Sequence, residues 1–188
     1  MLDQPLALAR LTLTDPKSAA RMALSPPLNR MVLVEALVML CCLSVVVAIA
    51  PFFLMGGNSE TFSEALGHPF LFAVIQIALQ FVLILGVYMV GGYFGGTGSF
   101  DDVFQALVWL QSVILGLQVI EVPLILLIPA VETIVTIAIA FYSLWLTVNF
   151  IAAVHRFQSL MAVLAIFIGT TFLAAFVLLL IWAILGLA

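Results

Sequence analysis

Charged residues are scarce in this chain: lysine, arginine, aspartate and glutamate make up 7% of 188 residues. A typical soluble domain has about 25%. Hydrophobic residues make up 66% of the chain, and its mean hydropathy is +1.38. A soluble domain needs more polar side chains than this to cover its surface, so the composition excludes that class and indicates a membrane protein.

Cysteine is nearly absent, with only Cys41 and Cys42, which are adjacent inside an apolar stretch. Neighbouring side chains on a helix point about 100° apart, so two such residues do not form a disulfide framework or a metal site. We interpret both as packing residues.

The common catalytic signatures are also missing. The sequence has no His-Glu-x-x-His, no Gly-x-Ser-x-Gly and no lysine after its glycines. Gly96 to Ser99, followed by Asp101 and Asp102, resembles the Gly-x-Gly-Asp of intramembrane aspartyl proteases, but that chemistry needs a second facing carboxylate and no other aspartate lies within an apolar stretch. We therefore expect no enzyme and no cofactor.

One group of residues has a metal-like spacing. Glu60, Glu64 and His68 are four residues apart, which on an unbroken helix would align three ligands. Gly67 and Pro69 make an unbroken helix improbable, so we do not expect a metal site.

Five long apolar stretches dominate what is present. Each is long enough to cross the roughly 30 Å of bilayer hydrocarbon, which takes about 20 helical residues. The sequence predicts an all-α polytopic membrane protein with a 1–30 arm and a 31–188 five-helix membrane domain. The predicted spans are residues 29–50, 69–94, 100–121, 132–153 and 159–185.

Prolines set several of these predicted boundaries. Pro51 is expected to close the first span. Residues 122–130, which contain Pro123 and Pro129, are expected to form a compact connection in the interface on the outer side of the membrane. Glu35 is the only charge inside the first span, since Arg30 lies at its very start, and we expect Glu35 to pair with a basic residue or to reach towards the interface.

The arm carries the signals of two short helices. Pro5 suits the first turn of one through Leu13, and Asp15 and Pro16 read as the N-cap and first residue of another through Leu24. Both mix leucine and alanine with basic residues, which predicts helices lying in the cytoplasmic membrane interface. A solvated arm is the alternative, because isolated helices this short are marginal in water.

The orientation follows from the five basic residues. With the N-terminus in the cytoplasm and five spans, all of them fall on the cytoplasmic side, as the positive-inside rule requires. The C-terminus then lies outside. These residues are Arg10, Lys17, Arg21, Arg30 and Arg156.

A glycine-rich corner, residues 91–100, lies between the second and third predicted spans and includes the first residue of the third. Glycine permits a positive φ and lets helices approach closely, and Ser99 with Asp102 has the spacing of a capping box. Neutral polar residues inside the spans are interpreted as contacts between helices, with Gln80 and Gln111 at matching depth. The candidate structural or interaction residues are Gly91, Gly92, Gly95, Gly96, Asp101, Asp102, Gln76, Gln80, Gln111 and Gln118.

These features together resemble the Yip (Ypt-interacting protein) family in its short bacterial form. The resemblance rests on the arm segment 14–20, the corner 91–100 and the polar end of the helix 142–156. It implies five membrane helices, a cytoplasmic N-terminus and a place in the bacterial inner membrane. Eukaryotic members bind small GTPases, but this sequence lacks their Asp-Leu-Tyr-Gly-Pro motif and long arm, which argues against GTPase binding.

The expected function is a non-catalytic one. The sequence favours a scaffold or accessory subunit that acts through contacts with lipids or other integral membrane proteins, and nothing in it indicates nucleic-acid binding. A small-solute transporter or channel is the alternative. A polar cavity at mid-membrane would favour the transporter, whereas a packed bundle with an apolar outer groove would favour a contact protein.

Overall fold

The computed structural model describes residues 3–57 and 69–184. These residues form helices and connecting turns, without a strand among them. The helices are α1 (Asp3–Thr14), α2 (Pro16–Ala23), α3 (Arg30–Leu54), α5 (Pro69–Tyr93), α6 (Phe100–Leu127), the short 3₁₀ helix η1 (Pro129–Val131), α7 (Glu132–His155) and α8 (Leu160–Ile184).

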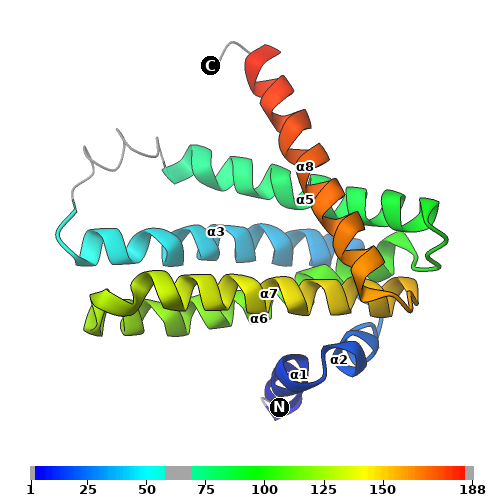
Figure 1. The fold of residues 1–188 in the computed structure, drawn as a ribbon, viewed down its shortest axis with the longest axis horizontal. Coiled ribbons are helices and arrows are strands. Elements are labelled where there is room, and N and C mark those ends of the chain that lie inside the picture. Colours follow the sequence, from blue (N-terminus) through cyan, green and yellow to red (C-terminus); the bar gives the residue numbers. More distant parts are fainter. Residues whose placement is uncertain (1–2, 58–68, 185–188) are drawn as a thin grey trace.

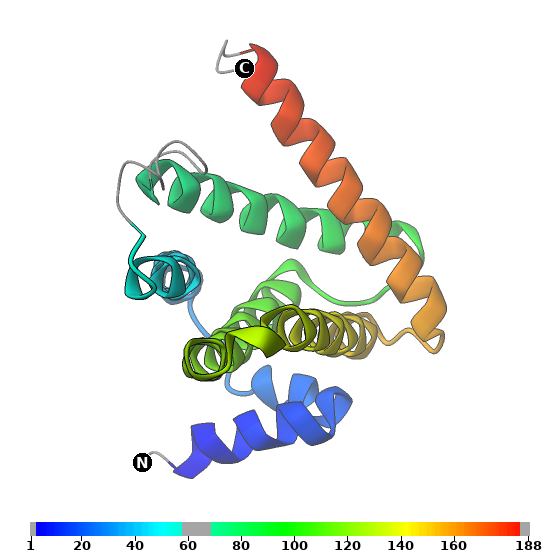
Figure 2. The same ribbon diagram turned by 60° about the vertical axis from the view of Figure 1, so that its left-hand side comes forward.

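Five of these helices are long and apolar enough to cross a membrane: α3, α5, α6, the η1–α7 segment and α8. The all-α class and the number of spans predicted from the sequence are confirmed. α3, α5, α6 and α7 run alongside one another in alternating directions, whereas α8 crosses α5 steeply and rises away from the bundle (Figure 1). The same view from another side keeps α8 apart from the other long helices over its second half (Figure 2).

Two predicted helix ends are wrong, and both involve a proline. α3 continues through Pro51 to Leu54, and α6 continues through Pro123 to Leu127 instead of ending at Glu121. A proline removes one helical hydrogen bond, but neighbouring helices and small local adjustments make this tolerable in membrane helices. The predicted connection 122–130 is therefore mainly the last turns of α6.

The two arm helices form close to where the sequence places them. Asp15 caps α2 by accepting a hydrogen bond from the Ser18 amide at 3.2 Å. The Ser18 hydrogen bonds hold the pKa of the Asp15 carboxyl below its usual value. The arm does not lie free in the interface, however: Ala19 and Ala20 are fully buried, and α2 packs against α7 and α6. Part of the apolar face of α2 therefore packs on protein, whereas Leu6 and Met22 of the arm remain exposed, and the predicted place of the arm in the membrane interface stays a prediction.

Polar contacts join α5 to its neighbours, as predicted. The Gln80 amide donates to the Gln111 side-chain oxygen of α6 at 2.9 Å, and the Gln76 amide donates to Ser44 of α3. Thr147 and Asn149 differ from the prediction, because each bonds to a carbonyl four residues earlier in its own helix. Such bonds satisfy a side chain without linking two helices.

Two predictions about ionisable groups can be followed further. Glu35 is exposed and makes no ion pair within the described residues, and the nearby Arg30 pairs with Asp101. The predicted pairing of Glu35 with a basic residue is therefore wrong, whereas its predicted reach towards the interface stays a prediction. Cys41 is buried in the core, as predicted for a packing residue, but Cys42 is exposed, so that interpretation is wrong for Cys42. The candidate metal ligands Glu60, Glu64 and His68 lie outside the described residues.

Candidate functional site

The site lies at the end of the bundle where the arm, the corner and the α7–α8 turn meet, which we call the corner end. α6 has 28 residues. At about 1.5 Å per residue it is ~42 Å long, about 12 Å more than the hydrocarbon thickness. Turns at the helix ends can therefore extend into the polar interface.

Gln105 fastens the link between the arm and α3. Its side-chain amide donates to the carbonyls of Ala23 at 2.7 Å and Pro26 at 2.9 Å, and its oxygen accepts from the Leu28 amide at 2.8 Å. The side chain is 6% exposed. These three bonds satisfy backbone groups of an irregular segment that has no helix of its own to satisfy them.

Two aromatic side chains hold α1 in place. The Tyr142 hydroxyl of α7 donates to the Leu13 carbonyl at 2.6 Å, and the Trp109 ring nitrogen of α6 donates to Thr12 at 3.0 Å. Tyrosine and tryptophan combine apolar contact area with one polar atom, which suits the boundary between a bundle and its covering arm. Side chains from both α6 and α7 thus position the arm.

The glycines of the corner end α5 with a Schellman motif. The Gly96 amide donates to the Gly91 carbonyl at 2.9 Å, and the Gly95 amide donates to the Gly92 carbonyl at 3.0 Å. Gly95 has a φ of +86°, so the predicted role of glycine in turning the chain is confirmed there. Gly92 differs from the prediction: a Cβ at this position would meet nothing within 4 Å, so Gly92 does not serve a close approach.

The close approach belongs to other glycines and to His155, which is 1% exposed at the end of α7. A Cβ at Gly91 would lie 2.5 Å from one ring nitrogen of His155, and a Cβ at Gly96 would lie 2.5 Å from the other. The Thr97 amide also donates to the His155 carbonyl at 3.3 Å. The absence of side chains at Gly91 and Gly96 lets the corner close over the imidazole.

The start of α6 carries the predicted capping box. Ser99 accepts from the Asp102 amide at 3.1 Å, and the Asp102 carboxylate accepts from the Ser99 amide at 3.1 Å and from its hydroxyl at 2.6 Å. Asp101 makes a different contact, because its carboxylate accepts two bonds from Arg30, at 2.6 and 3.0 Å. The two aspartates therefore fix the start of α6 and tie it to the start of α3.

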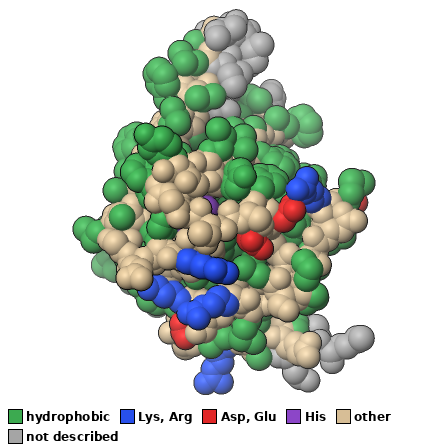
Figure 3. Space-filling view, turned by 90° about the vertical axis from the view of Figure 1, so that its right-hand side faces the viewer, with side chains coloured by type: hydrophobic (Ala, Val, Ile, Leu, Met, Phe, Trp, Pro, Cys, Tyr) green, Lys and Arg blue, Asp and Glu red, His purple; other side chains and the backbone are tan. Residues whose placement is uncertain are grey.

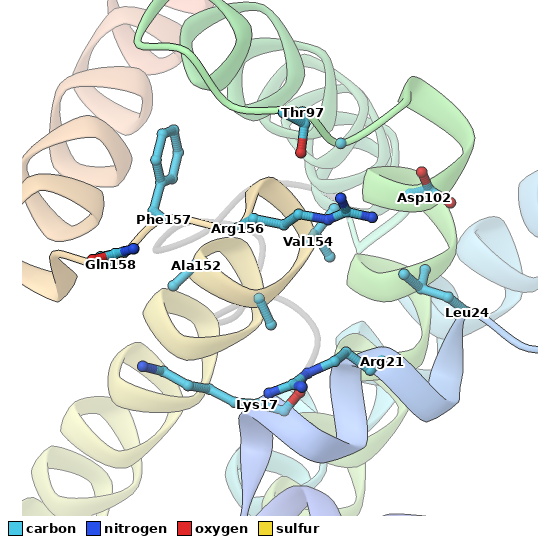
Figure 4. A pocket seen from close by; sticks show the side chains of 12 residues that line it. Lys17, Arg21, Leu24, Thr97, Asp102, Ala152, Val154, Arg156, Phe157 and Gln158 are labelled. Carbon is cyan, nitrogen blue, oxygen red and sulfur yellow. The ribbon is translucent and has the colours of Figure 1, made fainter.

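A cavity of about 640 Å³ opens beside these groups. Lys17 and Arg21 of α2 line one side, and Arg156 of the α7–α8 turn lines the other, with Thr97 and Asp102 beyond it (Figure 4). We call this cavity the basic pocket. Figure 3, which faces the corner end, shows Lys and Arg side chains gathered over this part of the surface. The remaining lining residues are Leu24, Gly98, Ala152, Ala153, Val154, Phe157 and Gln158.

The cations of the basic pocket have no carboxylate partner in the part of the chain that the structure describes. Lys17, Arg21 and Arg156 make no ion pair within 4 Å in the described part of the chain. The Asp102 carboxylate is occupied by Ser99. The charge of Arg21 also contributes to the lowered pKa of Asp15, but that carboxylate is used in capping α2. The hydrogen bonds from Ser99 leave the negative charge of Asp102 in place, but three cations outnumber this one carboxylate, so an anion entering the pocket would meet net positive charge.

Most of this site was not predicted from the sequence. Lys17, Arg21 and Arg156 indicated the orientation of the chain, the first two also an interfacial arm, and none of them was a candidate for a binding site. Gln105 is one of three glutamines in the largely apolar α6, and its polarity is the one signal that marks it. Of the predicted candidates only Asp102 lines the pocket; Gln118 lies at the far end, where its side-chain oxygen has no hydrogen-bond partner among the described residues.

Comparison with known proteins agrees with this architecture. The family model described as the Yip1 domain matches residues 10–183, which include the arm from Arg10 onwards, the corner and all five long helices apart from the last residue of α8. No curated protein and no solved structure matches the chain. Since the match covers nearly the whole sequence, the chain belongs to the Yip1 domain family and is a multi-pass membrane protein.

Proposed function

We propose that this protein is a non-catalytic component of the bacterial inner membrane. It acts as a scaffold or accessory subunit through contacts with lipids or other membrane proteins, and the basic pocket is where the contact is made. The observation that supports this proposal is the concentration around one cavity of three cations, Lys17, Arg21 and Arg156, that have no ion-pair partner among the described residues.

The way the arm is held supports the same proposal. Gln105, Trp109 and Tyr142 fix the arm through hydrogen bonds, so Lys17 and Arg21 are already placed opposite Arg156 before anything binds. A site that is ordered in advance loses less conformational entropy on binding than a mobile arm would.

The orientation is part of the proposal. The Lys and Arg residues of the pocket lie at the corner end, and the positive-inside rule then places this end in the cytoplasm. Cysteines introduced one at a time into a Cys41/Cys42-free background test it. Arg156→Cys should react only with reagents that reach the cytoplasm, and Ala130→Cys in η1 should react from outside. Labelling of position 156 from outside would overturn the orientation.

The transporter alternative has less support. A cavity of about 180 Å³ lies between α5, α6, α7 and α8, but its two amides, Gln80 and Gln111, are bonded to each other. Its lining within the described residues contains no ionisable side chain. A larger apolar groove of about 360 Å³ runs between α5 and α8. This combination of a bonded interior and an apolar outer groove favours a contact protein.

The test is a comparison of what the protein captures in its own membrane. The full chain is cross-linked in cells and purified in mild detergent, and the attached proteins and lipids are quantified by mass spectrometry. Replacing Lys17, Arg21 and Arg156 together by glutamine should remove the attached set. Arg10→Gln is the matched control, because Arg10 is exposed on α1 and does not line the pocket. The same set on the triple variant and on the wild type would overturn the proposal.

A further inference from the structure

We propose that the basic pocket is a binding site for a phosphate group, held by Lys17, Arg21 and Arg156. This inference rests on the proposed contact role of the corner end and specifies the chemistry of its ligand. A phosphate group is present both on anionic lipid headgroups and on small soluble phosphates, and the experiment below distinguishes these sources.

The charge of the pocket suits a phosphate. Its four ionisable side chains are three cations and Asp102. The carboxylate of Asp102 already accepts bonds from the Ser99 amide and hydroxyl. Arg30, the other basic residue near the corner, is neutralised by Asp101. The excess of positive charge is therefore confined to the groups that face the cavity.

The donors of the pocket also suit a phosphate. Two guanidinium groups can each offer a pair of parallel N–H donors to phosphate oxygens, and a lysine adds a mobile point charge. Thr97 and Gln158 add neutral donors to the lining, and they lie on the same side of the cavity as Arg156. Leu24 and Phe157 supply apolar surface beside these donors, which would accommodate the carbon skeleton attached to a phosphate ester.

The backbone of Arg156 gives an independent reason. Arg156 has φ 59° and ψ 32°, the left-handed conformation in which glycine is the usual residue after a helix. Its amide and that of Phe157 both donate to the Ala152 carbonyl, which closes the helix as a glycine would. The chain thus has a strained arginine where glycine would be more stable. In Figure 4 this arginine extends across the cavity towards Thr97 and Asp102. Strain kept at such a position points to a use of the side chain.

This strain makes a sharp test possible. Arg156→Gly should fold at least as stably as the wild type, because glycine adopts the left-handed conformation without penalty. It should nevertheless bind phosphate at least tenfold more weakly. A variant that gains stability and loses binding cannot be explained by misfolding. Arg156→Lys keeps the charge without the planar guanidinium, so its affinity for phosphate should lie between those of the wild type and of Arg156→Gly.

The experiment uses the purified full chain in phosphatidylcholine nanodiscs. Inorganic phosphate and glycerol 3-phosphate are titrated by calorimetry, and phosphatidylglycerol or phosphatidic acid is added to the bilayer and counted by native mass spectrometry. The wild type should bind one phosphate-bearing molecule, and Lys17→Gln combined with Arg21→Gln should weaken it at least tenfold. Arg10→Gln should bind as the wild type does.

The outcomes separate the ligand sources and the two proposals. Binding of the soluble probes alone identifies a soluble phosphate, and preferential retention of the anionic lipids identifies a headgroup; either supports the inference. Wild-type binding by Arg156→Gly would overturn it, as would equal binding of a glutamate-rich peptide, which would identify an acidic protein segment as the ligand. If the triple glutamine variant loses its captured partners but no phosphate probe binds the wild type, the contact function stands and the phosphate site fails. If the triple glutamine variant loses phosphate binding but keeps its captured partners, the phosphate site stands and the contact function fails.

Discussion

α7 and α8 are consecutive helices of similar length and composition, yet they differ in how much of their surface is buried. They have 24 and 25 residues, and both are strongly apolar. The second half of α7 is almost continuously buried from Leu146 to His155. α8 instead exposes large side chains such as Phe172, Leu173 and Phe176 along its length.

The difference lies in the polar and small residues around each helix. α7 receives the arm through Tyr142 and inserts His155 between the corner glycines. α8 makes one close approach of this kind, because a Cβ at Gly86 of α5 would overlap the buried Thr170, and within the described residues the Thr171 hydroxyl bonds to the Phe167 carbonyl of the same helix. Lipid tails are as apolar as leucine, so hydrophobicity alone does not drive one membrane helix against another. Close packing and hydrogen bonds decide which helix is central and which one faces lipid.

The largest effect should come from filling the space that holds the end of α7. Gly91→Val places a side chain against the His155 ring, and overpacking of this kind costs typically 1–3 kcal/mol, occasionally more. We expect about 3 kcal/mol, measured as a loss of stability in mild detergent. Gly92→Val is the matched control in the same helix turn, because its Cβ has open space, and it should be nearly neutral.

A second variant keeps this prediction tied to His155. In a His155→Ala background the ring is gone, so Gly91→Ala should cost clearly less than it does in the wild type. Equal cost in both backgrounds would show that the corner glycines do not serve the histidine, and the explanation of why α7 is central would lose its main support.

Release of the arm that covers α7 should have the next largest effect. Gln105→Leu removes three hydrogen bonds from the link at Ala23, Pro26 and Leu28. Each buried polar group left without a partner costs about 1–3 kcal/mol, but water can reach part of this link, so we expect about 2 kcal/mol in total. Faster proteolysis of the arm should accompany it.

Gln118→Leu serves as the control for that change, since it alters the same residue type in the same helix. The Gln118 oxygen has no partner among the described residues, so its replacement should be neutral or slightly stabilising. If Gln118→Leu loosens the arm as much as Gln105→Leu does, the arm is not held by the bonds described above.

A smaller effect is expected inside the bundle, at the contact between α5 and α6. Gln80→Leu leaves Gln111 without its partner and should cost about 0.5–2 kcal/mol. The double variant Gln80→Leu with Gln111→Leu should recover most of this loss, because no amide then remains unpaired. Thermal unfolding of Gln80→Leu, Gln111→Leu and the double variant measures these changes in stability. A double variant less stable than either single variant would contradict the pairing.

The smallest effect concerns the pH dependence of the arm. The pKa of Asp15 is lowered by its hydrogen bonds to Ser18, so the folded arm favours the ionised carboxylate. This contribution is fully present above the usual aspartate pKa and is lost as the pH falls through the lowered value. Protection of α2 from hydrogen exchange should therefore weaken slightly in acid. Asp15→Asn should show no such pH dependence, since asparagine caps a helix without titrating.

The sequence by itself determined the features that depend on neighbouring residues. Apolar stretches of sufficient length specify membrane helices, and Asp15 and Ser99 specify caps because their partners lie three residues away. The Gln80–Gln111 contact was also predictable, because a constant rise per residue fixes depth in the membrane.

Only the tertiary structure decided which faces meet. Helix rotation and tilt depend on packing against all neighbours at once, so an apolar pattern did not reveal that α3 and α6 continue through Pro51 and Pro123. For the same reason it did not reveal that Gly91 and Gly96, rather than Gly92, accommodate His155. The basic pocket depends on this arrangement most of all. Its cations come from α2 and from the α7–α8 turn, more than a hundred residues apart, and they share a cavity because the arm folds back on the bundle.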